Sequence, residues 1–152
     1  MNEQHEDFVH FVTCIYRLNS AWRTLVAVKA AGDHQLVGPA FRFALVGYAT
    51  PYNDSVGPLK SHRLRKSYLP SGLLPLHKRL LAARNQIHAH ADLTPLEAKL
   101  YLNEARGNRF ATNSTNPVHG LDEPENIDEI ICLIEGTLEK MDADYKRRER
   151  AL

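Results

Sequence analysis

The chain has 152 residues, of which 43% are hydrophobic and 24% are charged, and its net charge is +1. This length fits one domain with a core of its own, so we expect a single domain over residues 1–152. The first seven residues are polar and acidic, no run of about 18 apolar residues is present, and there are only two cysteines. These features argue against a signal peptide, a membrane span and a disulfide scaffold, and they favour a cytoplasmic setting.

Positive charge is concentrated in the middle of the chain. Residues 55–91 hold seven Lys and Arg, no Asp or Glu, and four of the eight histidines. A basic stretch is often only a solvated face, but one that also holds histidines fits a site for an anion such as RNA phosphate. The candidate RNA contacts are the basic residues Arg63, Arg65, Lys66, Lys78 and Arg79.

The first predicted helix is the longest. Apolar residues recur every three or four positions from Phe8 to Leu25, which predicts a helix over about residues 6–31 that ends at Gly32. A long helix with one apolar stripe is typical of a helix bundle. Cys14 and Cys132 both fall on apolar stripes, so we expect both to be buried.

The second predicted helix is short and is followed by irregular chain. Pro39 can open it, helical spacing continues to Thr50, and Pro51 ends it. Residues 52–58 are rich in turn-forming types, and residues 59–68 form a short basic piece for which a helix is one option.

Two further helices complete the predicted fold. Leucine, alanine and isoleucine at helical spacing predict a third helix over residues 73–90, and a clear stripe predicts the last one from Ile127. Between them, residues 99–102 and 109–112 flank a turn-like segment and could form a small hairpin. The pattern as a whole predicts an all-α fold, an up-and-down bundle of four or five helices with room for a small hairpin or irregular insertion before the last helix.

One candidate active site lies at the end of the third predicted helix. Arg84, Asn85, His88 and His90 fall within seven residues, inside the basic stretch. A guanidinium matches a phosphate and keeps its charge, and an imidazole can take up or release a proton near neutral pH. Together they suit RNA cleavage, in which a base activates the 2′-OH, a cation stabilises the charge growing on phosphorus, and an acid protonates the leaving 5′-oxygen. That reaction needs no metal and no other cofactor.

Helix geometry limits which of these residues can act together. On a regular helix Arg84 and His88 share a face, whereas Arg84 and His90 point about 240° apart. Pairing Arg84 with His90 therefore requires the helix to end near His90, or a second copy of the segment. A two-fold dimer supplies that copy, so we expect a homodimer.

The segment from Arg84 to His90 resembles the R-x(4–6)-H motif of HEPN domains, including the polar residue directly after the arginine. The leucines before Arg84 and the aspartate Asp92 after the histidine are similar to HEPN proteins of abortive-infection and toxin type. The resemblance implies a dimeric helical bundle with a metal-independent endoribonuclease site at its interface. It also implies a role as a toxin, in phage defence or in RNA processing, with a cognate antitoxin or regulatory protein as a further partner.

The resemblance also implies a role for each residue. Arg84 would bind the scissile phosphate, Asn85 would orient the phosphate or the arginine, and His90 would be the acid–base group. His88 and Asp92 rank as supporting residues. Toxins of this type that a partner nucleotidyltransferase modifies carry a tyrosine where this chain has Asp92, so we do not expect that modification.

Other interpretations stay open. A module of HEPN type could bind RNA, a nucleotide or a protein without turnover, and a helical scaffold or antitoxin-like protein could use its apolar faces for assembly alone. Arg84 could simply pair with an acidic residue of the last helix. His88, His90 and Asp92 are also similar to the H-x-H-x-D zinc ligands of metallo-β-lactamase-fold hydrolases, but Leu93 stands where that family has a further histidine, and its fold is an α/β sandwich.

Overall fold

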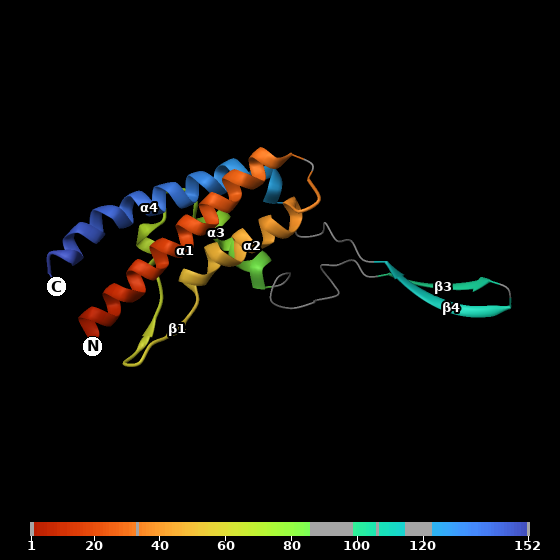
Figure 1. Cartoon of the computed structure of the whole chain (residues 1–152), viewed down its shortest axis with the longest axis horizontal. Helices are drawn as coiled ribbons and strands as arrows, with labels where there is room; N and C mark the ends of the chain where they lie inside the picture. Colours follow the sequence, from red (N-terminus) through yellow and green to blue (C-terminus); the bar gives the residue numbers. More distant parts are fainter. Residues whose placement is uncertain (1, 33, 86–98, 106, 115–122, 152) are drawn as a thin grey trace.

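The computed structural model describes residues 2–32, 34–85, 99–105, 107–114 and 123–151. Within them, four helices form the body of the molecule: α1 (Glu3–Ala31), α2 (Val37–Ala49), α3 (Leu74–Ala83) and α4 (Ile127–Glu149). The long helices α1 and α4 pack side by side, α2 packs on α1, and α3 packs on α2 (Figure 1). The start of α1 and the end of α4 therefore lie at the same end of the bundle.

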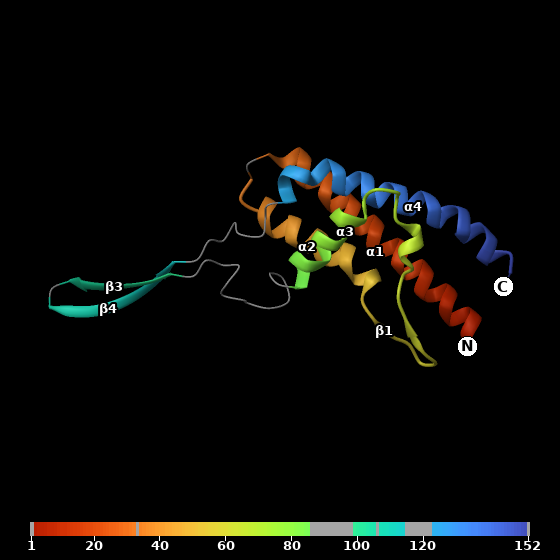
Figure 2. The ribbon, with the colours of Figure 1, turned by 180° about the vertical axis from the view of Figure 1, so that it is seen from behind.

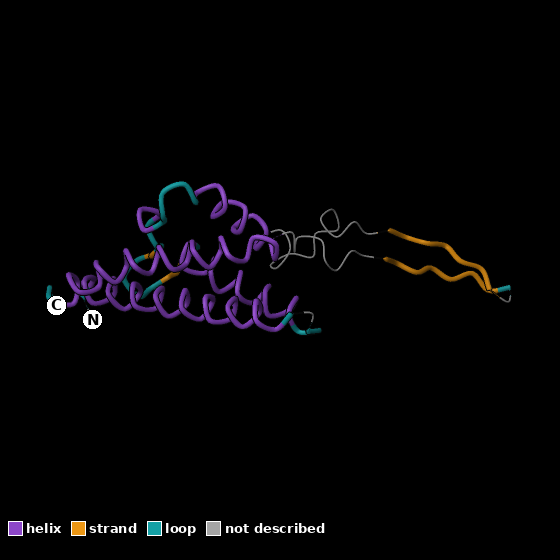
Figure 3. Tube along the Cα trace, turned by 90° about the horizontal axis from the view of Figure 1, so that it is seen from above, coloured by secondary structure: helices purple, strands orange, loops and turns teal. Residues whose placement is uncertain are grey.

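Two antiparallel hairpins accompany the helices. The first is short, with β1 (Ser55–Val56) paired to β2 (Ser61–His62), and it lies beside the N-terminal half of α1 (Figure 2). The second pairs β3 (Lys99–Ala105) with β4 (Asn108–Ser114) and extends away from the helices (Figure 3). Three 3-10 turns complete the described chain: η1 (Thr50–Tyr52), η2 (Lys66–Tyr68) and η4 (Glu123–Asn126).

Local chemistry explains where α1 begins and ends. The side chain of Asn2 accepts a hydrogen bond from the backbone N–H of His5, which caps the first turn, and Glu3 and Glu6 lie in that turn, where the helix dipole favours acids. Gly32 follows the helix with a φ of 58°, a conformation that glycine adopts without strain. The predicted end is confirmed, and the helix begins at Glu3, earlier than expected.

The core confirms the apolar stripes of the predicted helices. Each large apolar side chain buried there stabilises the fold by roughly 1.5–3 kcal/mol relative to its exposed state. All four helices contribute fully buried residues, among them Leu18, Leu25, Phe41, Leu45, Leu80, Ile130, Leu133, Ile134 and Met141.

The prediction of an all-α fold is wrong, because two hairpins interrupt the helices. The β3–β4 hairpin lies where the sequence suggests a small hairpin, and it is longer, spanning residues 99–114. The β1–β2 hairpin falls across residues expected to be a turn-rich connection and a short basic piece. That piece is not α-helical: β2 and η2 form there instead, because His62 is held by side chains of α1.

Two further expectations concern α3 and the cysteines. α3 is α-helical from Leu74 to Ala83 and is followed by a π-helical turn at Arg84 and Asn85, and its predicted end near His90 lies outside the described residues. Cys14 is buried as predicted, but Cys132 is exposed. The buried stripe of α4 runs through Ile130, Leu133 and Ile134, and Cys132 falls on the other side of the helix, where the stripe does not reach.

Candidate functional site

The candidate catalytic segment begins at the C-terminal end of α3. Arg84 keeps helical backbone angles, with φ −57° and ψ −46°, and its backbone N–H donates to the carbonyls of Leu80 and Leu81. The chain therefore stays helical at Arg84, and Arg84 and Asn85 are assigned to a π-helical turn that follows the α-helix. Short π-helical turns of this kind occur frequently at functional sites.

The side chain of Arg84 is held by its neighbour. It is half-buried, and its Nη1 donates to the Oδ1 of Asn85 at 2.9 Å. Within the described part of the chain no carboxylate pairs with Arg84, so the alternative of an ion pair with the last helix is not found there. The remaining guanidinium donors are the groups that a phosphate would require.

The other predicted residues of this segment lie outside the described residues. These are His88, His90 and Asp92, so the structure places neither the predicted acid–base histidine nor the alternative metal ligands. In the described ranges no group of three or more His, Cys, Asp or Glu side chains could hold a metal ion.

The predicted RNA contacts divide between two parts of the fold. Arg63 follows β2 and pairs with Asp54 at 2.7 Å, while Arg65 and Lys66 are exposed at and before η2. Lys78 and Arg79 are exposed on α3, whose buried face carries other residues. The basic stretch is therefore not one continuous face.

A second polar cluster, which was not predicted from the sequence, lies where the β1–β2 hairpin meets α1. The ring of His62 is buried, with Nε2 2.7 Å from Oε1 of Glu6 and Nδ1 3.1 Å from Oδ1 of Asp7. The backbone N–H groups of Leu59 and Lys60 donate to the Glu6 carboxylate, and Lys60 Nζ lies 2.9 Å from Asp7. Glu6 therefore joins α1 to the hairpin through both side chain and backbone.

These contacts keep both carboxylates ionised. The hydrogen bond from His62 lowers the pKa of Glu6 despite its burial, and the backbone N–H bonds lower it further. The hydrogen bond from Lys60 in the same way lowers the pKa of Asp7. The cluster thus fastens the hairpin to the bundle through the hydrogen bonds of Glu6 and the ion pair of Lys60 with Asp7.

His10 extends this cluster along α1. Its ring stacks on that of His62, with centroids 4.9 Å apart, and its Nε2 lies 3.6 Å from the Sγ of Cys14. Burial lowers the pKa of His10 and raises the pKa of Cys14 to about 11, so the thiol stays protonated and unreactive near neutral pH. A spacing of four residues from Glu6 to His10 to Cys14 is the signal that could have placed these three on one helix face.

Comparison of the chain with protein-family models, with curated proteins and with solved structures finds no match in any of the three. Its function is therefore inferred from its own residues and contacts. None of the described helices combines the length and the apolar character needed to cross a membrane.

Proposed function

We propose that the chain is a metal-independent endoribonuclease of HEPN type, with Arg84 and His90 as its catalytic pair. The observation that carries this proposal is the state of Arg84, which is half-buried at the end of α3 with its guanidinium bonded to Asn85. An arginine held in this way keeps its charge and a planar set of donors for a phosphate. A toxin or phage-defence role in the cytoplasm, held in check by a cognate antitoxin or regulatory protein, accords with the motif.

The reaction requires two proton transfers around one phosphorus. The ribose 2′-oxygen attacks the phosphorus while a base takes the 2′-OH proton. The bond from phosphorus to the 5′-oxygen then breaks, and an acid gives that oxygen a proton. The products are a 2′,3′-cyclic phosphate and a free 5′-OH, and Arg84 stabilises the negative charge on the phosphoryl oxygens in the transition state.

A homodimer supplies the groups that one chain lacks. Each chain has one His90, and the reaction uses a base and an acid at the same time. Two copies of the segment brought together by a two-fold axis provide two arginines and two histidines. We therefore propose that the site is composite and that the monomer is inactive.

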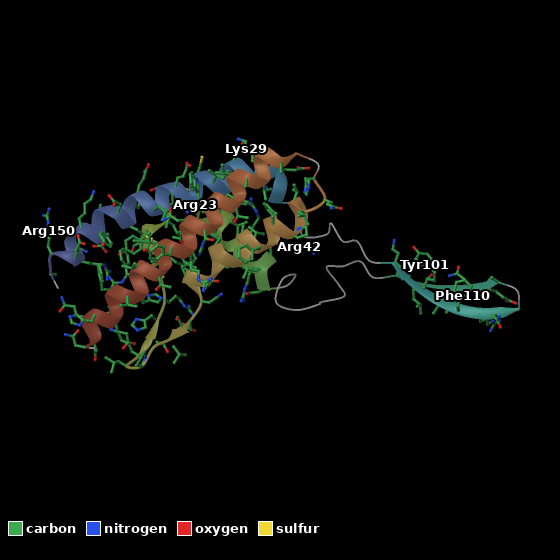
Figure 4. All side chains as sticks on the ribbon, viewed as in Figure 1. Arg23, Lys29, Arg42, Tyr101, Phe110 and Arg150 are labelled. Carbon is green, nitrogen blue, oxygen red and sulfur yellow. The ribbon has the colours of Figure 1, made fainter. Side chains whose placement is uncertain are left out.

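The test is cleavage of single-stranded RNA with EDTA present. Four proteins are compared: the wild type, Arg84→Ala, His90→Ala and the control Arg23→Ala. Arg23 is exposed on α1 and is labelled in Figure 4, so its replacement removes the same charge as Arg84→Ala away from α3. We expect wild type and control to cleave alike, and both active-site variants to lose at least about 100-fold in rate.

Two outcomes would contradict the proposal. Equal cleavage by all four proteins would place the activity elsewhere or in a contaminant. A wild-type protein that binds RNA and never cleaves it would be the silent binding module instead. Light scattering on the same samples tests the dimer, and circular dichroism shows whether each variant is folded.

A further inference from the structure

The two basic segments of the chain meet at one end of the bundle. One runs from Lys60 to Lys66 through β2 and η2, and the other is the C-terminal end of α4. η2 packs on α4, the hydroxyl of Tyr68 donates to Asp144, and Lys140 Nζ donates to the carbonyl of Leu69 at 2.6 Å. Segments about 80 residues apart in the sequence thus form one surface.

Two cavities open on this surface and share Arg65 and Tyr68. Their volumes are about 250 and 450 Å³. Their linings hold six cationic side chains and two carboxylates, and one of the six cations, Arg63, pairs with Asp54 outside the linings. We call this surface the basic groove; its cations are Lys60, Arg63, Arg65, Lys140, Arg147 and Arg148, and its carboxylates are Asp7 and Asp144.

The carboxylates of the basic groove are already shared. Burial by itself would raise the pKa of Asp144, but hydrogen bonds from Tyr68, Arg148 and Arg147 lower it to about 2. One negative charge therefore faces two guanidiniums. Asp7 is shared in the same way by Lys60 and His62. Arg65 is exposed, and within the described residues it forms no ion pair, so positive charge is left over for a ligand.

Part of the basic groove is held rigid before any ligand arrives. The guanidinium of Arg148 lies 4.3 Å from the ring centroid of Phe11, which in turn packs on the ring of Tyr68 at 5.7 Å. The Nε of Arg148 is 2.9 Å from Asp144. A cation fixed by a ring and a carboxylate loses little conformational freedom on binding, which favours affinity.

We propose that the basic groove binds the phosphodiester backbone of single-stranded RNA, apart from the catalytic segment at the end of α3. Two neighbouring cavities that share the side chains of Arg65 and Tyr68 suit a run of phosphates better than a single anion. Cations along such a track bind the backbone without regard to base sequence. The choice of RNA as the ligand rests on the proposed function, whereas the affinity for phosphate rests on the groove alone.

The experiment measures RNA binding in a protein that cannot cleave. In a His90→Ala background, a short labelled single-stranded RNA is titrated by fluorescence anisotropy at several salt concentrations. The groove variant is Arg65→Gln with Arg147→Gln, both exposed residues. The matched control is Arg23→Gln with Lys29→Gln, which removes two charges from α1. Figure 4 labels both residues, and it shows Lys29 at the opposite end of the bundle from Arg150, near the end of α4.

We expect the groove variant to weaken Kd by about tenfold at physiological salt, and the control by less than about twofold. For single strands, each phosphate that the protein neutralises adds about 0.7 to the slope of log K against log salt. The groove variant gives up two such cations, so its slope should be shallower by about 1.4. The slope is the sharper result, because it reports how many phosphates the protein binds and not only how tightly.

Three outcomes would overturn the inference. The first is that the His90→Ala parent protein does not bind RNA. The second is that the groove variant and the control weaken RNA binding equally, which would mean that binding depends only on the overall charge of the protein. The third is stoichiometric displacement of the RNA by inorganic phosphate at constant ionic strength, which indicates a site for a single phosphate. Cleavage is not read in this experiment, so its failure leaves the test of Arg84 and His90 intact.

Discussion

The two hairpins of this protein are stabilised in opposite ways. The strands of β1–β2 have two residues each, and those of β3–β4 have seven. The shorter hairpin buries His62 against α1, whereas on the longer one Leu102 is 81% exposed and Tyr101 is 49% exposed. Tyr101 and Phe110 are labelled on the extended hairpin in Figure 4. Strand length therefore says little about how firmly a hairpin is attached.

The difference lies in where each hairpin finds its partners. β3–β4 depends on its own ladder, from Lys99 opposite Ser114 to Ala105 opposite Asn108. A two-stranded ribbon of this kind is only marginally stable in water. β1–β2 has almost no ladder, and it depends on Glu6, whose carboxylate binds His62 and two backbone N–H groups of the connecting loop. A change at the α1 contact should therefore affect the whole bundle, and a change in β3–β4 should stay local.

The largest effect is expected for Gly57→Ala. A Cβ at this position would overlap with Oε1 of Glu6 and lie 3.0 Å from Nε2 of His62. The carboxylate cannot move aside without breaking its bonds to His62 and to the loop, so either those hydrogen bonds or the position of the hairpin must change. We expect the free energy of unfolding, measured with urea, to fall by about 3 kcal/mol.

Gly47→Ala is the control for that substitution. Its Cβ would meet Ala21 at 3.6 Å, an ordinary contact, and alanine is the better helix former in the interior of α2. Its stability should be unchanged or slightly higher. If the two alanine variants were equally stable, the hairpin would not be fastened through Glu6.

The second largest effect is expected from low pH, which should weaken the contact between the β1–β2 hairpin and α1. The folded pKa of Glu6 and of Asp7 is lowered, so their contribution to stability is fully present above the unfolded values near 4.5 and 3.8, and it disappears as the pH falls through the folded values. Unfolding should therefore take up protons below about pH 4.5. In Glu6→Gln this uptake, obtained from the slope of stability against pH, should be smaller by up to about one proton.

The matched control for acid is Glu104→Gln, which makes the same substitution on β3. Its side chain is exposed on the extended hairpin, so the slope should remain that of the wild type. Equal slopes for wild type and Glu6→Gln would show that the buried contact with His62 is not what binds the hairpin in solution.

The same contrast explains which parts of the fold could be predicted from the sequence. The helices follow from apolar spacing within each segment, and the β3–β4 hairpin follows from two strand-like segments around a turn at Gly107, so both are encoded locally. The β1–β2 hairpin could not be predicted, because His62 contacts Glu6, which is 56 residues away in the sequence. The residues around each of the two give no indication of this contact. Single-sequence patterns do not report contacts of that range.

The candidate sites divide in the same way. Arg84 and Asn85 are adjacent in the sequence, so a short sequence motif is enough to predict that they lie together at the end of α3. The basic groove required Arg65 and Arg148 to be brought together by the packing of η2 on α4, which no spacing in the chain reveals. The positive charge at the end of α4 also has a local explanation in the helix dipole, so the sequence alone does not call for a ligand there.

The smallest effect is expected for Gly107→Ala, at the turn between β3 and β4. Gly107 has a φ of 74°, which costs other residues about 1 kcal/mol, but a Cβ there would meet no atom within 4 Å. The substitution should therefore destabilise the β3–β4 hairpin and leave the stability of the helices unchanged. Amide exchange across β3 and β4 should speed up about fivefold, while the unfolding free energy of the bundle changes by less than about 0.5 kcal/mol. A loss of bundle stability as large as that of Gly57→Ala would mean that the extended hairpin is coupled to the helices, and that its exposed strands stabilise the fold as much as the buried contact of Glu6 with His62 does.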